Sequence, residues 1–275
     1  MSSSLFWRHN GLPYAELRRV NDGRKVNYAP HSHPQWSIGA ITEGRCTFQY
    51  RQDHYPISSG DLVMMNPQWV HSCNPVEDHP WAYWMMYIDT HWLMQLLQDA
   101  GLSADNVWQP INRAVIPPQD HTTNWYQDYC EMAAVFSDNT SPLLAKQSLL
   151  IDFLLSLMGW LRNTTTQIVL PPRALEAVAQ RLTDNLSETP TLAELQAIAD
   201  CSEGHLIRSF KSHYGLTPHA YLINQRIQYS QQLLKQGQGI ADIAQQLAFS
   251  DQAHFQRAFK KLTATTPGQY LKNAL

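Results

Sequence analysis

The sequence has few of the features that mark secreted, membrane-spanning or zinc-finger proteins. Its four cysteines lie far apart in the chain and form no Cys-x-x-Cys pair, so we expect free thiols and neither a disulfide framework nor a zinc finger. No apolar run approaches the length of a membrane span, and residues 1–10 lack the apolar core of a signal peptide. These absences predict a cytoplasmic protein with reduced thiols and no membrane partner.

Charged residues are also scarce, at 16% of the chain against 44% for hydrophobic residues, which is the balance of an ordinary globular protein. The charges are unevenly divided, because residues 1–170 have a net charge of −5 and residues 171–275 have a net charge of +2. A weakly basic part joined to an acidic part is typical of a DNA-binding module attached to a domain that avoids DNA. With 275 residues, the chain is long enough for two domains that each bury a core.

The last third of the chain contains an internal repeat. The sequence HLIRSFKSHYGLTPHAYL at 205–222 aligns with HFQRAFKKLTATTPGQYL at 254–271 at a shift of 49 positions. A short apolar helix precedes each copy, and two helices joined by a tight turn form a helix-turn-helix unit. We therefore expect two such units, at about 191–213 and 239–262.

A long helix is expected between the two units, over residues 218–236. Thr217 is a suitable N-cap, and Pro218 takes the first helical position, where proline is favoured. At ~1.5 Å per residue this helix spans roughly 28 Å, close to the ~34 Å between successive major-groove faces of B-DNA. Its length therefore suits the presentation of two recognition helices to adjacent grooves. The alternative is an all-helical protein-interaction module with the same periodicity.

The outward faces of the two recognition helices supply the candidate DNA contacts. Arg and Gln can bind a base edge through two hydrogen bonds, whereas Lys mostly contacts phosphate. A solvated helix face is the alternative for any one of these residues, and we expect base contact above all from Arg208, Gln252 and Arg257. The full candidate set is Gly204, Ile207, Arg208, Lys211, Gln252, Ala253, Gln256, Arg257 and Lys260.

Short strands separated by turn signals dominate residues 1–110, which is typical of a sandwich or a small barrel. The clearest runs lie at 36–41, 46–50, 61–65 and 81–88, and the first two are separated by a turn signal, Thr42-Glu43-Gly44. Residues 121–162 predict two antiparallel helices. The second has an apolar stripe wide enough to pack on its own domain or on another chain, formed by Leu150, Leu154, Leu157, Met158 and Leu161.

The C-terminal part resembles the AraC/XylS family of bacterial transcription regulators. The resemblance covers about residues 174–272 and rests on motifs such as HLIRSFK, GLTP, IADIA and FSDQAHFQRAFK. It implies a regulator that binds double-stranded operator or promoter DNA as a homodimer, and that contacts RNA polymerase if it is an activator. Ala248 and Ala264 stand where the family usually has glycine, so each adds strain if the backbone needs a positive φ there.

Residues from about 14 to 90 resemble the cupin-like barrel that many family members carry. The pattern includes His31-Ser32-His33, Gly44, Ser58-Ser-Gly60-Asp61 and Val70-His71-Ser-Cys-Asn74. The resemblance implies an α+β fold with no catalytic residue and no cofactor. Its expected parts are an effector-binding barrel (1–110), a helical dimerisation segment (111–163), a linker (164–172) and a DNA-binding domain of two helix-turn-helix units joined by a long helix (173–275).

Three histidines, His31, His33 and His71, could converge on a divalent metal in such a barrel. The cupin enzymes that they resemble add a glutamate shortly after the first pair, and residues 34–38 contain no carboxylate. Three alternatives stay open: surface or hydrogen-bonded structural histidines at the barrel mouth, a metal-dependent cupin enzyme or metal sensor, and a regulator controlled by a protein partner. The favoured hypothesis is a small-molecule effector in an aromatic-walled pocket. Its candidate residues are His31, His33, Trp36, Tyr50, His71, Asn74, Trp81 and Tyr83.

Overall fold

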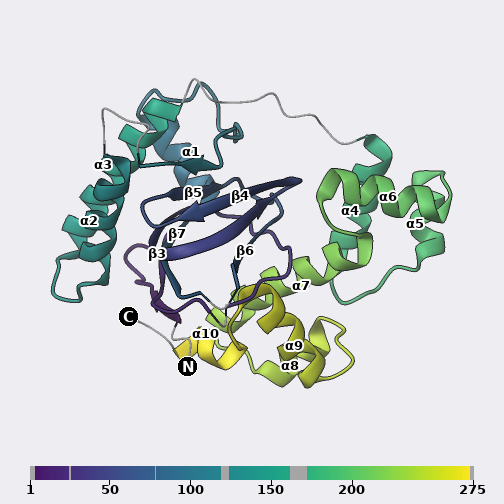
Figure 1. Cartoon of the computed structure of the whole chain (residues 1–275). Helices are drawn as coiled ribbons and strands as arrows, with labels where there is room; N and C mark the ends of the chain where they lie inside the picture. Colours follow the sequence, from purple (N-terminus) through teal and green to yellow (C-terminus); the bar gives the residue numbers. More distant parts are fainter. Residues whose placement is uncertain (1–3, 25, 78, 119–123, 162–171, 273–275) are drawn as a thin grey trace.

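The computed structural model describes residues 4–24, 26–77, 79–118, 124–161 and 172–272. In the described chain, eight strands form the N-terminal barrel, three helices cover one side of it, and the C-terminal part is helical (Figure 1). The strands are β1 (Ser4–Trp7), β2 (Ala15–Val20), β3 (Trp36–Tyr50), β4 (Asp53–Ser58), β5 (Leu62–Met65), β6 (His71–Pro75), β7 (Trp81–Ile88) and β8 (Val115–Ile116).

The long strand β3 connects the two sheets of the barrel. Its first half pairs with β5 and β7, and its second half pairs with β4 and β6, all antiparallel. The prediction of a turn at residues 42–44 is wrong, because β3 continues through these residues. Its pairing with β7 only shifts register between Ile41 and Glu43. Such a bulge bends the strand and lets it change sheets without leaving the ladder.

Alternation along the strands separates two hydrophobic cores. Trp36 and Ile38 of β3, with Met86 of β7, face the helices, while Phe48 and Tyr83 face the barrel interior. Successive strand residues point to opposite faces, so a single sheet supplies both cores. The interior core therefore fills the barrel, and the outer core joins the barrel to its helices.

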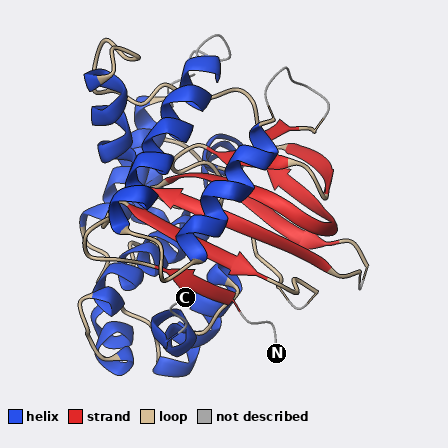
Figure 2. Cartoon of the chain, turned by 90° about the vertical axis from the view of Figure 1, so that its left-hand side faces the viewer, coloured by secondary structure: helices blue, strands red, loops and turns tan. Residues whose placement is uncertain are grey.

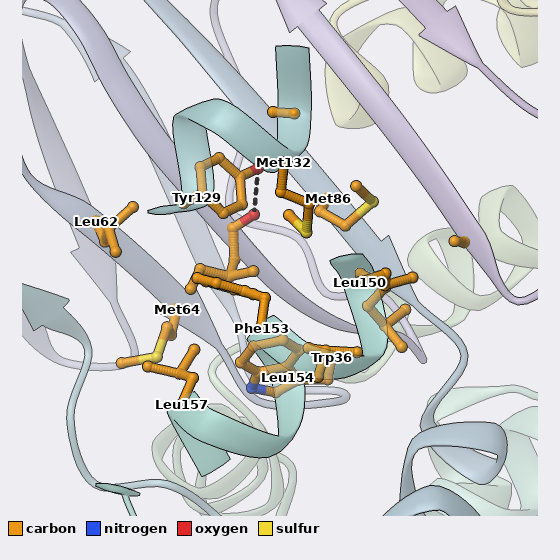
Figure 3. Packing of buried hydrophobic residues seen from close by; sticks show 14 of the residues in the cluster. Trp36, Leu62, Met64, Met86, Tyr129, Met132, Leu150, Phe153, Leu154 and Leu157 are labelled. Atoms are coloured by element: carbon orange, nitrogen blue, oxygen red, sulfur yellow. Dashed lines mark hydrogen bonds between the residues drawn. The ribbon is translucent and has the colours of Figure 1, made fainter. Parts of the chain in front are cut away.

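Three helices cover the outer face of the sheet (Figure 2): α1 (Thr90–Asp99), α2 (Trp125–Ser137) and α3 (Leu143–Leu161). The apolar stripe of α3 packs on its own domain, since Leu150, Leu154 and Leu157 are completely buried against the barrel and α2 (Figure 3). Tyr129 of α2 also donates a hydrogen bond to the Ile38 carbonyl. Of the described helices, only α3 is long and apolar enough to cross a membrane, by length and composition alone.

The segment 111–163, expected to be helical, also contributes to the barrel. Strand β8 pairs with β5, and the Ile111 N–H donates to the side chain of buried Asn66. The helices begin only at Trp125. The chain therefore closes the barrel before it forms the helical pair. The expected linker, 164–172, lies outside the described residues apart from residue 172.

The C-terminal helices match the expected pair of helix-turn-helix units. They are α4 (Arg173–Asp184), α5 (Leu192–Ala199), α6 (Glu203–Tyr214), α7 (Pro218–Lys235), α8 (Ile240–Gln246), α9 (Gln252–Thr263) and α10 (Pro267–Lys272). Thr191 and Glu194 form a capping box on α5, and the Thr217 hydroxyl caps α7 by accepting from Ala220 N–H. Ser202 takes the N-cap position of α6 without a side-chain hydrogen bond.

Candidate nucleic-acid interface and interdomain cavity

The recognition helix of the first unit, α6, is anchored by Leu206 and Phe210, which are completely buried. On its opposite face Gly204, Arg208 and Lys211 are exposed, and Ile207 is half-buried. The exposed face thus carries the candidate DNA-binding residues of this unit. It remains a prediction that they contact DNA.

The recognition helix of the second unit, α9, has the same division. Phe255 and Phe259 are completely buried, and the Asp251 carboxylate caps the helix by accepting from His254 N–H. The exposed residues are Gln252, Ala253, Arg257 and Lys260, and Gln256 is half-buried. Both outward faces are therefore free of core packing, as a groove-reading helix requires.

Arg226 of α7 ties the two units together, and the sequence patterns did not single it out. This arginine is 3% exposed. It donates to the carbonyls of Leu186 (2.9 Å) and Glu188 (2.8 Å) before α5, and to that of Ala248 (3.4 Å) after α8. One guanidinium thus spans both units from the middle of the long helix. In the sequence, Arg226 is marked only as a charged residue beside the apolar Ile227 in the long helix.

The two alanines that depart from the family pattern have left-handed backbones. The φ angle is 51° at Ala248 and 55° at Ala264. Ala248 lies after α8, and Ala264 is the C-cap of α9. The condition stated for these positions, a positive φ, is met, and each alanine therefore places a Cβ atom where glycine has none.

The DNA-binding part docks on the mouth of the barrel through polar side chains of α7. Asn224 donates to the Ser32 hydroxyl (2.9 Å) and accepts from the Ser32 N–H (3.2 Å). Gln228, one turn further along, donates to the Ser32 carbonyl (2.9 Å). Figure 1 shows α7 passing along the barrel between the two helical units. The long helix that separates the units therefore also contacts the barrel.

Ion pairs and backbone bonds extend this contact to the second unit. Lys235 at the end of α7 and Arg8 of the barrel share the Glu16 carboxylate, at 2.8 and 2.6 Å. Burial works to raise the pKa of Glu16, but Lys235 and Arg8 lower it below its usual value. Arg18 donates to the carbonyl of Thr263 at the end of α9 (3.0 Å). The barrel thus contacts both the connecting helix and a recognition helix.

A cavity of about 150 Å³ lies at this interface, lined by residues of both domains. Arg18, His31, His33 and Tyr87 come from the barrel, and Gln228 is one of the α7 residues. The barrel interior behind the mouth holds only about 30 Å³ of free volume. The aromatic core therefore fills the barrel, and the larger space is at its mouth.

The eight candidate effector residues do not lie together in one pocket. His31 and His33 line the interdomain cavity, while His31, His71, Trp81 and Tyr83 line the small interior space. Tyr50 and Asn74 have structural hydrogen bonds, to Asn66 and to the backbone of Tyr28. The placement of Trp36 in the pocket is wrong, because strand alternation turns its ring to the helices, where it is completely buried.

The three histidines lie close together and are held in the neutral form. Their ring centroids are 4.6, 4.8 and 6.4 Å apart. Each Nδ1 atom lies 2.8–2.9 Å from a backbone carbonyl, which can only accept, so Nδ1 carries the proton and Nε2 is an acceptor. Burial lowers the pKa of His33 to about 3 and that of His71 to about 4, and it lowers the pKa of His31 well below its usual value. Among the described residues, no group of three or more His, Cys, Asp or Glu is arranged to hold a metal ion.

Two family models match the chain. One described as an AraC-like ligand binding domain matches residues 13–137, and one described as a helix-turn-helix domain matches residues 195–273. The chain is 27% identical to the HTH-type transcriptional regulator YbfI of Bacillus subtilis, over 84% of this chain and 82% of the relative. It is 21% identical to the lactose operon transcription activator of Staphylococcus xylosus, over 84% of this chain and 81% of the relative.

Solved structures of ToxT from Vibrio cholerae have a similar two-domain fold. An apo ToxT variant gives a TM-score of 0.61 at 16% identity, over 94% of this chain and 97% of that chain. ToxT bound to an unsaturated fatty acid gives 0.57 at 14% identity, over 98% and 94%. The relatives named above are transcription regulators and not enzymes. The chain belongs to the AraC/XylS family of transcription regulators, with an AraC-like ligand-binding domain followed by a helix-turn-helix DNA-binding domain.

Proposed function

We propose that this regulator binds two adjacent major grooves of its operator through α6 and α9, and that a small effector in the interdomain cavity controls this binding. The observation that carries the proposal is that barrel and α7 residues line the same cavity. A ligand that contacts both domains binds the docked arrangement better than the separated one. It therefore shifts the population between them, which is the energetic requirement for control.

The geometry of α7 supports the DNA-binding half of the proposal. This helix has 18 residues, and Arg226 at its middle is bonded to segments of both units. At ~1.5 Å per residue this helix is roughly 27 Å long, to be compared with the ~34 Å between neighbouring major grooves, and the widths of the units at its ends add to its reach. Any change in how the barrel holds α7 is passed to both recognition helices.

A homodimer in the cytoplasm is part of the proposal, because paired half-sites need paired readers. The outer face of α3 is the candidate dimer surface, since Leu144 is 73% exposed and Leu149 is 41% exposed there. Contiguous exposed apolar patches mark protein contact sites, and these two leucines would contribute to such a patch in the dimer. If the regulator is an activator, the bound dimer would also contact RNA polymerase.

Footprinting with the full chain and DNA from upstream of its own gene tests the proposal. We expect protection of two adjacent major grooves on one side of the duplex in each half-site. Arg257→Gln should relax the preference at one base pair and weaken specific binding by about 1–3 kcal/mol. Lys260→Gln is the matched control, because a phosphate contact weakens binding to all sequences alike. Protection of a single groove by each chain would contradict the proposal, and so would a footprint that no metabolite changes.

A further inference from the structure

We infer that the ligand of the interdomain cavity is a short hydroxylated anion, held by Arg18 and by the imidazoles of His31 and His33. Its charge would be a carboxylate or a phosphate ester, which share the chemistry that a guanidinium recognises. This inference rests on the proposed function, since it names the chemical class of that effector. It depends on the charge, the hydrogen-bonding groups and the size of the cavity.

Arg18 is a buried cation whose partners in the described chain are all neutral. The side chain belongs to a residue that is 3% exposed and that lines the cavity. It donates to the Thr263 carbonyl (3.0 Å) and to the Ser4 hydroxyl (2.9 Å), and the Tyr87 phenol is a further neutral partner. The Nε atom has no hydrogen-bond partner in the residues that the structure describes. A guanidinium cannot lose its proton at neutral pH, so a buried one without an acidic partner favours an anion.

The nearby carboxylate of Glu16 does not compensate Arg18. Glu16 is already bound by two cations, Arg8 at 2.6 Å and Lys235 at 2.8 Å. The other acidic residue that lines the cavity, Asp89, accepts from the Trp92 N–H as the N-cap of α1. With Arg8 counted, three cations and two carboxylates lie at this interface, and Arg18 is the cation that has no carboxylate partner among the described residues.

The two cavity histidines require donors from a ligand. Nδ1 of His31 and Nδ1 of His33 each donate to a backbone carbonyl at 2.9 Å, which leaves Nε2 of both as acceptors. Within the described part of the chain, neither Nε2 atom has a hydrogen-bonding partner. A ligand hydroxyl can donate to such an atom, but a hydrocarbon chain or a bare carboxylate cannot. The cavity therefore favours an anion that also carries hydroxyl groups.

The size of the cavity favours a short molecule. Its volume is about 150 Å³, and a protein cavity of ~150 Å³ accommodates a molecule as large as benzene. The interior space behind it adds only about 30 Å³. A three- or four-carbon hydroxy acid is of suitable size, whereas a long fatty acid is not.

The test uses calorimetric titration and thermal shift of the full chain with matched pairs of probes. The anions are glycerate, threonate and glycerol 3-phosphate, and glycerol and threitol are their neutral counterparts. Butyrate lacks hydroxyls, and decanoate represents a longer chain. We expect at least one hydroxylated anion to bind at least about tenfold more tightly than its neutral counterpart and than butyrate, because charge-assisted bonds to a buried group contribute that much. Comparison of glycerate and threonate with glycerol 3-phosphate shows whether the cavity prefers a carboxylate or a phosphate ester.

Substitutions in β2 assign the binding to Arg18. Arg18→Gln should weaken the anion by at least about tenfold, and Arg18→Lys, which retains the charge, should recover part of the loss. Arg19→Gln is the matched control, because Arg19 is the next residue of the strand, faces its other side and is stacked over Trp84. If Arg18→Gln does not fold, as circular dichroism would show, the comparison of anions with neutral probes on the wild-type chain decides the matter.

Equal binding of the neutral probes, tighter binding of decanoate, or no binding by any of the three hydroxylated anions would overturn the inference. Binding that is unchanged in Arg18→Gln would overturn it as well. These failures differ from failure of the proposed function. An operator footprint that responds to a neutral metabolite would uphold effector control and contradict the ligand class. An anion that binds through Arg18 without changing the footprint would uphold the ligand class and contradict effector control.

Discussion

The left-handed backbone at Ala248 stores strain that a single substitution can remove. A non-glycine residue in this conformation costs roughly 1–2 kcal/mol. Substitution by glycine removes this cost, but the greater freedom of glycine in the unfolded chain offsets part of the gain in stability. Ala248 is exposed and its φ is 51°, so its methyl group has little packing to lose. We expect Ala248→Gly to raise the free energy of unfolding by about 0.5–1 kcal/mol.

Urea denaturation of the full chain measures this change. The matched control is Ala197→Gly, an exposed position inside α5, where glycine should lower stability by about 1 kcal/mol. If both substitutions lowered stability alike, strain at residue 248 would be excluded.

Acid should destabilise the protein through its buried histidines. The pKa of His71 is lowered from 6.5 to about 4 because the ring is buried, and the residue is 4% exposed. Below pH 6.5 the unfolded chain binds a proton at this residue that the folded chain does not, so stability falls as the pH decreases toward 4. We expect a loss of up to about 1.4 kcal/mol per pH unit from this residue, and none above pH 7.

Unfolding in urea at pH 7.5, 6.0 and 5.0 gives the slope of the free energy of unfolding against pH. His71→Asn can retain the bond to the Trp69 carbonyl without the titration, so its slope should be smaller. His54→Gln changes an exposed histidine and should leave the slope as in the wild type. A slope that His71→Asn leaves unaltered would assign the acid sensitivity to other groups.

At the scale of single residues, the sequence predicted those features that depend only on residues nearby in the chain, such as the outward face of a helix. The outward faces of α6 and α9 follow from helical periodicity, and the positive φ at Ala248 and Ala264 follows from the glycine pattern of the family. The roles of Arg18 and Arg226 could not be predicted, because their partners lie 245 positions and 22–40 positions away. Trp36 was misplaced since period-two alternation identifies two faces without saying which one meets the helices.

At the scale of elements, helices were predicted better than strands. The expected N-cap at Thr217 is confirmed, because α7 begins at Pro218 and the Thr217 hydroxyl accepts from the Ala220 N–H. The strand signals at 36–41 and 46–50 belong to one 15-residue strand, because pairing with β7 continues through the bulge. A bulge and a turn require the same local residues, and only the partner strand distinguishes them.

The outer face of α3 leads to a prediction about assembly. Leu144 and Leu149 are 73% and 41% exposed, whereas the inner stripe is used by the chain itself. Leu144→Glu combined with Leu149→Glu should therefore convert dimers to monomers without unfolding the barrel, because a charge buried in an apolar interface is strongly unfavourable. Light scattering at several concentrations measures the mass. Leu271→Glu is the matched control, since Leu271 is 43% exposed on α10 in the other domain. Dimers that persist in the double variant would place the contact on another surface.

At the scale of the whole molecule, the polar contact between Asn224 and Ser32 is one of several that hold the domains together. Asn224 is 2% exposed and forms two hydrogen bonds with Ser32 across the interface. Asn224→Ala should weaken docking by about 2 kcal/mol, at ~1 kcal/mol for each bond, which is close to a thirtyfold change in the docking equilibrium. The expected result is a larger radius of gyration in X-ray scattering and an operator affinity that responds less to the effector. The radius of gyration rises because the separated arrangement is more extended than the docked one. The effector response falls because the ligand stabilises the docked arrangement, which the variant populates less.

Tyr229 provides the control for this experiment, because it lies on the same helix and is 38% exposed. Tyr229→Ala should leave both the radius and the effector response unchanged. If Asn224→Ala enlarged the molecule but left the effector response intact, the ligand would act within the barrel alone, and control through the docking of α7 would be excluded. If neither quantity changed, the contacts of Lys235 and Arg18 would be sufficient to hold the domains together, and a combined substitution of Asn224 and Lys235 would then have to separate them.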